Sequence, residues 1–216
     1  MIDYRVYLVT DNPSRYRRDW LETIEAALDG GVTCVQYRDT ENPAQTQYAR
    51  IVRLQDLLRP RHIPLIVNND PELATAVKAE GVHVGQGDMP PEQVRSIVGP
   101  RCEIGLSITC SADLSASSLI PRPQSTVDCI GIGPVYDARK TKADASAAIG
   151  PEGVREIVSL VPEIPNCAIG GITVENAAET LSAGAKGLAI VSALSQSEDP
   201  YETARHFRLL FDRRRV

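Results

Sequence analysis

The sequence predicts an α/β protein folded as a single (β/α)8 TIM barrel, and three observations support this prediction. Short apolar runs rich in Val and Ile recur eight times along the chain. Each run is too short for a helix and nearly continuous, which is typical of parallel strands covered on both faces. Segments with helical periodicity lie between them without a long structureless gap. Eight such units in 216 residues favour a closed barrel over a doubly wound open sheet, the alternative considered.

The expected elements follow the chain in order. The strands are expected at residues 4–10, 32–38, 63–68, 81–86, 103–107, 127–133, 166–171 and 187–191. The helices are expected at 16–29, 43–59, 71–79, 91–98, 176–183 and 200–211. Helical spacing puts two sets of side chains on core-facing stripes: Trp20, Ile24, Ala27 and Leu28 in the first helix, and Ala49, Val52, Leu54 and Leu57 in the second. No linker interrupts the pattern, so residues 1–216 are expected to form one domain.

Composition excludes several classes of function. Hydrophobic residues make up 43% and charged residues 24%, and the net charge of −5 is spread along the chain. The basic end Arg213–Arg215 is interpreted as solvated, so no nucleic-acid or membrane partner is expected. No apolar run approaches 18 residues and no signal peptide is recognisable, which predicts a cytoplasmic protein. The five cysteines lack metal-ligand spacing and are interpreted mainly as small core residues.

The functional site is expected where the strands end, because barrels of this class carry their active sites at the carboxyl ends of the strands. The residues at those positions are strongly polar, although the strands before them are not. They are Thr10 and Asp11, 36–40, 68–70, 86–88, 107–109, 133–142, Gly170 and Gly171, and Val191 and Ser192. Polar groups that converge from eight strand ends predict a binding site.

Two groups of these residues predict sites for anions. Gly170 and Gly171 follow the seventh strand and Ser192 follows the eighth, each at the start of a helix, where free N–H groups bind phosphate. A tight turn is the alternative for the two glycines. Arg38 and Lys142 indicate a second anionic pocket, although Arg38 could instead be a structural ion-pair partner.

Three further polar residues have alternative interpretations. Asn69 and Asp88 offer oxygen ligands suited to magnesium, which needs few protein ligands when phosphates supply the rest. Asp88 could equally cap the helix that begins near Pro90. His83 lies within a strand and is interpreted as a hydrogen-bonded residue of the barrel interior rather than a catalyst. The spacing of a dinucleotide-binding loop is absent.

Eight segments, spread over nearly the whole chain, follow one another in this order: YLVTD, GGVTCVQYRD, PLIVNND, GVHVGQGDMP, IGLSIT, IGIGPVYDARKTKAD, AIGGIT and GLAIVSAL. Together they resemble the thiamine-phosphate synthase family. It implies a transferase that joins a pyrimidine diphosphate to a thiazole phosphate, with Mg2+ as cofactor, and releases pyrophosphate. The partners it implies are these phosphorylated small molecules.

The resemblance also assigns residues to roles. Arg38, Ser107 and Lys142 would be catalytic, and Asn69 and Asp88 would bind magnesium. The substrates would be bound by Gln36, Tyr37, Arg38, Asp39, Thr40, Asn68, Ser107, Arg139, Lys140, Thr141, Lys142, Gly171, Val191 and Ser192. Within this set, Gly171, Val191 and Ser192 match the loops for the thiazole phosphate, and Thr141 would help to bind the same substrate.

The chain departs from the family pattern at three places. Asn69 stands where the family usually has Asp, and Thr40 stands where it usually has Lys. The loop after the sixth strand has one extra residue, and its Arg139 and Lys140 could restore the cationic charge that Thr40 lacks. Asp70 could reach the metal in place of an aspartate at position 69.

Two other functions stay open at this point. A thiazole tautomerase of the same fold would have a weakened diphosphate and metal site, but it needs an acid–base group, often a His, after the fifth strand, where this chain has Ile108, Thr109 and Cys110. A non-catalytic protein that binds thiazole phosphate is the second alternative. The sequence leaves open whether the thiazole carries a carboxylate and whether the chain forms a homo-oligomer. Loop 137–148 is expected to order over bound diphosphate.

Overall fold

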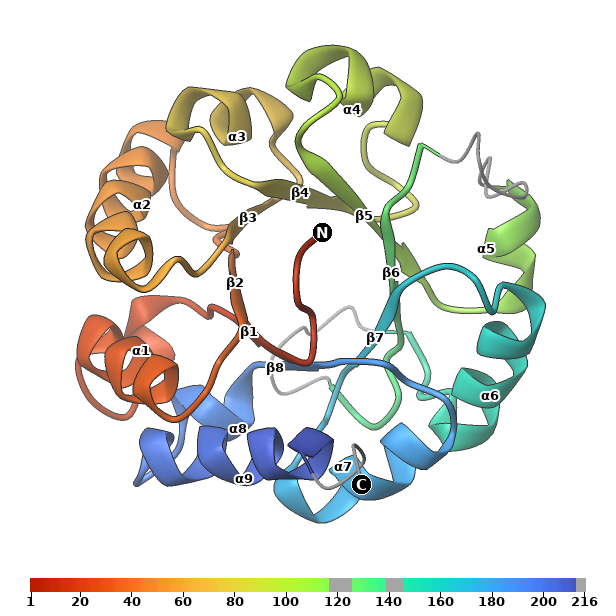
Figure 1. Cartoon of the computed structure of the whole chain (residues 1–216). Coiled ribbons are helices and arrows are strands. Elements are labelled where there is room, and N and C mark those ends of the chain that lie inside the picture. The colour runs from red at the N-terminus through yellow and green to blue at the C-terminus, as the bar shows by residue number, and fades with distance from the viewer. Residues whose placement is uncertain (117–125, 139–145, 213–216) are drawn as a thin grey trace.

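The computed structural model describes residues 1–116, 126–138 and 146–212, and its sheet is a closed barrel of eight parallel strands in sequence order (Figure 1). The strands are β1 Val6–Val9, β2 Cys34–Tyr37, β3 Leu65–Asn68, β4 Gly81–Val84, β5 Glu103–Ile108, β6 Cys129–Ile132, β7 Asn166–Ile169 and β8 Leu188–Ile190. The barrel closes where β8 pairs with β1, with Val6 opposite Leu188. The predicted TIM barrel and all eight predicted strands are therefore confirmed.

Helices surround the barrel and follow the strands. Their bounds are η1 Pro13–Arg15, α1 Trp20–Asp29, α2 Ala44–Leu58, η2 Arg59–Arg61, α3 Pro71–Val77, α4 Pro91–Val98, α5 Ser111–Ala116, α6 Gly150–Leu160, α7 Val174–Ser182, α8 Ser192–Ser195 and α9 Pro200–Asp212. Helix α1 begins at Trp20 rather than residue 16 because the Asp19 carboxylate accepts the N–H groups of Leu21 and Glu22, which caps the helix there.

The predicted buried face of α2 is wrong in part. Leu54 is buried as predicted, but Ala49 and Val52 are exposed and Leu57 is half-buried, and the helix buries Ile51 and Leu58 instead. Both stripes satisfy helical spacing, and the packing of α2 against the barrel decides between them. In α1, by contrast, the four predicted core residues Trp20, Ile24, Ala27 and Leu28 are all buried.

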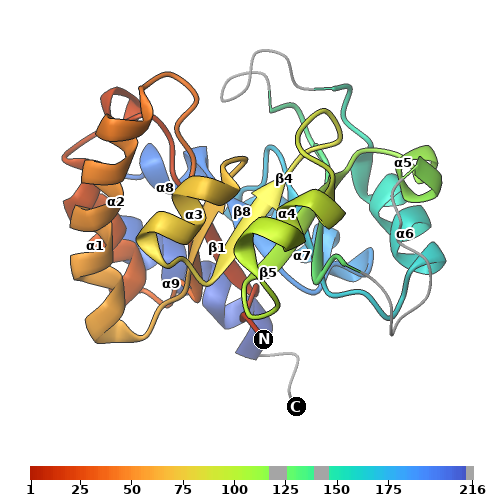
Figure 2. The same cartoon turned by 90° about the horizontal axis from the view of Figure 1, so that it is seen from above.

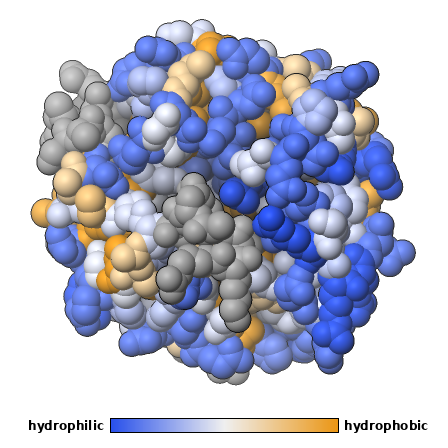
Figure 3. Space-filling view, turned by 180° about the vertical axis from the view of Figure 1, so that it is seen from behind, coloured by the Kyte–Doolittle hydropathy of each residue, from blue (hydrophilic) through white to orange (hydrophobic). Residues whose placement is uncertain are grey.

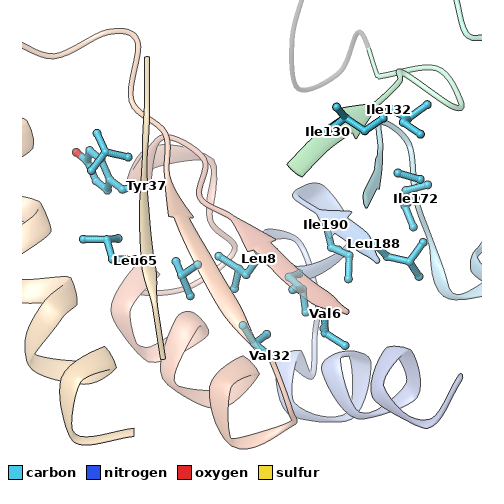
Figure 4. Packing of buried hydrophobic residues seen from close by; sticks show 14 of the residues in the cluster. Val6, Leu8, Val32, Tyr37, Leu65, Ile130, Ile132, Ile172, Leu188 and Ile190 are labelled. Carbon is cyan, nitrogen blue, oxygen red and sulfur yellow. The ribbon is translucent and has the colours of Figure 1, made fainter. Parts of the chain in front are cut away.

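The buried residues form two clusters, one on each side of the strands. The larger cluster lies between the strands and the surrounding helices, and Figure 4 shows part of it, including Val6, Tyr37 and Leu65. The smaller cluster fills the barrel interior with Tyr7, Val9, Cys34, Ile66, Cys129, Cys167 and Ala189. The five cysteines are free thiols, and the three in this interior cluster pack as small core residues.

The N-terminal segment closes the amino end of the barrel. Ile2 and Tyr4 pack against the interior cluster, and the N-terminus lies over the barrel axis in Figure 1. The Glu103 carboxylate accepts hydrogen bonds from the Ile2 N–H at 2.7 Å and the Tyr4 hydroxyl at 3.1 Å. The side view shows the N-terminus at one end of the barrel and the loop that follows β4 at the other (Figure 2).

No helix within the described ranges is long and apolar enough to cross a membrane.

Candidate active site

The loops at the carboxyl ends of the strands form the mouth of the barrel. Figure 3 views the molecule from this side, opposite to the side with the N-terminus, and strongly hydrophilic residues gather to the right of the centre of the face. The predicted strand-end residues that the structure describes lie here because all eight strands point the same way. This mouth is the candidate active site.

Arg38 lies directly after β2, and its main chain is held from β1. The Thr10 hydroxyl accepts the Arg38 N–H at 2.9 Å and donates to the Arg38 carbonyl oxygen at 3.3 Å. The guanidinium makes no hydrogen bond or ion pair with any described residue. A cation without a protein partner, on a fixed main chain, is suited to an anionic ligand.

Tyr37 and Asp39, the neighbours of Arg38, hydrogen-bond to each other and to nearby residues. The side chain of Tyr37 is buried outside the barrel, among the residues that pack against the helices, and its hydroxyl donates to Asp39 at 3.0 Å. The Asp39 carboxylate also accepts bonds from Asn42 and from Arg50 at 2.8 Å. Burial raises the pKa of Asp39, but hydrogen bonds from Asn42, the Glu41 N–H and Tyr37 outweigh it and hold the pKa below its ordinary value. Tyr37 and Asp39 thus shape the loop after β2.

A hollow of about 330 Å³ lies between the loops that follow β2 and β3. Its lining brings together four residues predicted from the sequence: Asp39, Thr40, Asn68 and Asn69. Asn69 has a left-handed main chain with φ of 63°, and its N–H donates to the His83 carbonyl oxygen at 2.8 Å. Asp70 also lines the hollow, but it caps α3 by accepting the Leu73 N–H at 2.7 Å.

The two predicted magnesium ligands lie on neighbouring loops. Met89, next to Asp88 in sequence, lines the same hollow as Asn69. Asp88 is exposed and does not cap α4, whose N-cap is Pro90; one oxygen instead accepts the Gly85 N–H at 2.7 Å. Its other oxygen and the Asn69 amide have no partner among the described residues. A carboxylate and an amide oxygen are hard donors, so these residues fit a magnesium ion whose remaining ligands are phosphate and water.

Below the mouth, two hydrogen-bonded pairs orient the polar side chains of the barrel interior. Gln36 is buried, and its amide nitrogen donates to the Tyr7 hydroxyl at 2.6 Å. Burial raises the pKa of Tyr7 well above its ordinary value, so the hydroxyl stays protonated. Ser107 lies 3.0 Å from the Nε2 atom of His83, and its carbonyl oxygen accepts a bond from Gln86 at 2.7 Å.

His83 is a hydrogen-bonded interior residue, as predicted. Its imidazole occupies space that Gly105 and Gly131 leave open, because a Cβ at Gly105 would lie 2.3 Å from the Nδ1 atom of His83. Burial lowers the pKa of His83 to about 4, despite the opposing charge of Asp88. The ring is therefore neutral near pH 7 and acts as a hydrogen-bond partner of Ser107.

The loops after β7 and β8 offer main-chain donors. Gly170 and Gly171 have positive φ angles of 97° and 65°, and a Cβ at Gly171 would lie 2.7 Å from the Cβ of Tyr136. The glycines therefore permit a close turn against the loop after β6. The N–H groups of Gly171, Ile172, Ser192 and Ala193 have no acceptor among the residues described. The glycine loop after β7 can thus serve both packing and anion binding.

Four predicted site residues, Arg139, Lys140, Thr141 and Lys142, lie outside the described residues, as does most of loop 137–148. Sequence reasoning named Thr10 only as a strand-end residue and did not single out Tyr7. The signal for Tyr7 was its alternation with Val9, which places both side chains on the inner face of β1.

The comparisons with known proteins agree with this geometry. The family model described as "Thiamine monophosphate synthase" matches residues 6–194. The thiamine-phosphate synthase of Azorhizobium caulinodans is 44% identical over 210 residues, covering 97% of this chain and 96% of its own length. That of Albidiferax ferrireducens is 42% identical, covering 96% and 92%. A solved structure, the thiamine phosphate pyrophosphorylase from Pyrococcus furiosus, superposes with a TM-score of 0.82 at 30% identity, covering 98% and 96%.

The fold and its polar mouth are those of a (β/α)8-barrel enzyme. The chain belongs to the thiamine monophosphate synthase family. The predictions of this family, of an enzyme and of a transferase in thiamine biosynthesis are confirmed, and none of these comparisons favours the tautomerase or the non-catalytic binder.

Proposed function

We propose that the mouth of this barrel couples a pyrimidine diphosphate to a thiazole phosphate, forming thiamine phosphate and pyrophosphate. One observation carries the proposal: two separate sets of groups suited to anions share one mouth. The Arg38 guanidinium lies after β2, and the N–H groups of Gly171 and Ser192, which have no acceptor among the described residues, lie after β7 and β8. Two phosphorylated substrates need two such sites.

The pyrimidine diphosphate would bind on the β2–β3 side. The bond between the pyrimidine methylene carbon and the diphosphate oxygen breaks, and its electron pair leaves with pyrophosphate. Arg38 and Lys142 would neutralise the charge that develops on the leaving group. Asn68 and Thr40, which line the hollow beside Arg38, would complete the pocket, with Arg139 and Lys140 restoring cationic charge. Gln36 and Ser107 would contact the pyrimidine ring.

The thiazole phosphate would bind on the opposite side. Its phosphate would accept hydrogen bonds from the main chain of Gly171 and Ser192, with Val191 beside them and Thr141 contacting the same substrate. The thiazole nitrogen then donates its lone pair to the methylene cation, which forms the new carbon–nitrogen bond. Tyr37 and Asp39 would act by holding the loop that carries Arg38, as their buried contacts suggest.

Magnesium would be held by Asn69 and Asp88. When bound there, the ion would supply positive charge for the diphosphate. Asn69 is neutral where the family usually has an aspartate, so the ion would rely more on phosphate oxygens. We further propose that the whole chain acts as one cytoplasmic domain, which its free cysteines suit.

The test is turnover of the purified chain with both substrates and magnesium, measuring thiamine phosphate and pyrophosphate together. Equal amounts of the two products are expected, with none when either substrate or the metal is omitted. Absence of both products, with thiazole phosphate still bound in calorimetry, would contradict the proposal and favour the non-catalytic binder. A shift of the thiazole double bond without pyrophosphate release would favour the tautomerase.

A further inference from the structure

Two threonines make the same pair of hydrogen bonds at opposite ends of strands β1 and β2. At the carboxyl end, the Thr10 hydroxyl accepts the Arg38 N–H at 2.9 Å and donates to the Arg38 carbonyl at 3.3 Å. At the amino end, the Thr33 hydroxyl accepts the Val6 N–H at 3.0 Å and donates to the Val6 carbonyl at 3.1 Å. Each hydroxyl thus holds both main-chain groups of one residue on the neighbouring strand.

The Thr10 hydroxyl ends the ladder between the two strands. The Thr10 N–H donates to the Gln36 carbonyl at 2.8 Å, as a regular parallel ladder requires. The next bond of such a ladder would run from the Arg38 N–H to the main-chain carbonyl of Thr10. The Thr10 hydroxyl takes that N–H instead. Since Thr10 is 1% exposed and β-branched, its hydroxyl is shielded from water and restricted in rotation.

We propose that Thr10 is a positioning residue. Its hydroxyl fixes the main chain of Arg38 and thereby places the guanidinium within reach of the diphosphate. The inference rests on the role of Arg38 in the function proposed above. Arg38 has a long side chain without a partner in the described part of the chain, so the position of its main chain is what the fold controls. Thr10 itself is buried, and both hydrogen bonds of its hydroxyl go to the main chain of Arg38.

Further contacts join the loop after β1 to the loop after β2 near Arg38. The Asp11 carboxylate, which follows Thr10 and is buried, accepts bonds from the Asn12 N–H at 2.8 Å and from Arg15 at 3.2 Å. Arg15 also pairs with Glu41 of the loop after β2 at 3.0 Å. These contacts join the loops but do not touch the Arg38 main chain. Within the described ranges, the Thr10 hydroxyl alone hydrogen-bonds the N–H and carbonyl of Arg38.

The test compares Thr10→Val with its matched control, Thr33→Val. Both substitutions keep the shape of the side chain and remove the same two hydrogen bonds, at opposite ends of the barrel. The probe is inorganic pyrophosphate with magnesium, whose dissociation constant is measured by calorimetry, because this reads the diphosphate pocket without turnover. Thr10→Val is expected to weaken binding about tenfold through misplacement of Arg38, and Thr33→Val by less than about twofold. Thr10→Ser, which keeps the hydroxyl, should restore binding.

A double-mutant cycle with Arg38→Ala separates positioning from general stability. If Thr10 acts through Arg38, adding Thr10→Val to Arg38→Ala should weaken pyrophosphate binding no further. Equal effects of the two threonine variants, additive effects in the cycle, or unchanged binding in Arg38→Ala would each overturn the inference. Failure of the proposed reaction has a different outcome: the natural chain would bind pyrophosphate through Arg38 but form no thiamine phosphate.

Discussion

Two charged side chains at opposite ends of the barrel, Glu103 and Arg38, differ in how the fold treats them. At the amino end, the Glu103 carboxylate accepts hydrogen bonds from Ile2 and Tyr4 and lies 3.4 Å from the N-terminal ammonium group. At the carboxyl end, the Arg38 guanidinium finds no partner in the described part of the chain. At the amino end of the barrel the protein itself satisfies the charge, whereas at the carboxyl end the charge is available to a ligand.

One barrel thus separates the charges that stabilise the fold from those available to a ligand. A charge whose hydrogen bonds are satisfied by the protein stabilises the fold, and its removal leaves other groups unpaired. A charge that only water satisfies adds little to the fold, but its full interaction remains for a ligand.

Replacing the unpaired charge should affect activity far more than stability. Arg38→Ala is expected to lower kcat/KM for the pyrimidine diphosphate by roughly 10²–10³-fold, because a charge that stabilises the leaving group is lost. The melting temperature should stay nearly the same, since no described residue loses a partner. Arg53→Ala, an exposed arginine on α2, is the control and should keep full activity. A large loss of stability in Arg38→Ala would contradict the proposed difference between Arg38 and Glu103.

Between the two ends, His83 should make stability depend on pH. Its pKa is about 4 in the folded chain and 6.5 when unperturbed, so between these values the unfolded chain binds a proton that the folded chain does not. Stability should therefore fall as pH drops from 6.5 to 4, by about 2–3 kcal/mol, and be fully present above 6.5. Melting temperatures across this range should vary less in His83→Gln. The exposed His62→Gln is the control, and equal slopes in both variants would contradict the prediction.

Replacing Glu103 at the amino end should lower stability and leave activity unchanged, which is the reverse of the effect expected for Arg38. Glu103→Gln replaces a charged acceptor with a neutral one and should lower the free energy of unfolding by about 1–2 kcal/mol. Urea denaturation measures this loss. Steady-state constants for both substrates should stay unchanged at 25 °C, because Glu103 lies at the end of the barrel away from the mouth. A change in either KM would show that the two ends are coupled.

The smallest effect is expected from restoring a charge at the mouth. Asn69→Asp should tighten magnesium binding several-fold, roughly 1 kcal/mol, because a carboxylate is a stronger ligand than an amide. Stability should fall slightly, since Asp70 and Asp88 lie on the same and the neighbouring loop. Magnesium titration of turnover measures the change. An unchanged magnesium requirement would mean that position 69 does not contact the ion.

Local sequence patterns predicted the strands better than the helices and the contacts between elements, and the bounds of α5, α6 and α8 were not predicted. All eight strands were predicted, because a buried parallel strand is a continuous apolar run that needs no knowledge of its neighbours. The buried face of α2 was predicted wrongly in part, because Ala49 and Val52 have the spacing of a stripe but the helix buries Ile51 and Leu58. Only the packing of the helix on the barrel distinguishes the two stripes.

The candidate site also has features that the sequence predicted and contacts that it did not. The barrel, the end that carries the mouth, and the residue types after each strand could be predicted from the sequence, since apolar periodicity and strand direction are local properties. The hydrogen bonds of Thr10 with Arg38, of Tyr7 with Gln36, and of His83 with Ser107 are visible only in the folded chain. Each of these pairs joins two strands, so it depends on the register of the closed barrel, which the packing of the whole chain sets.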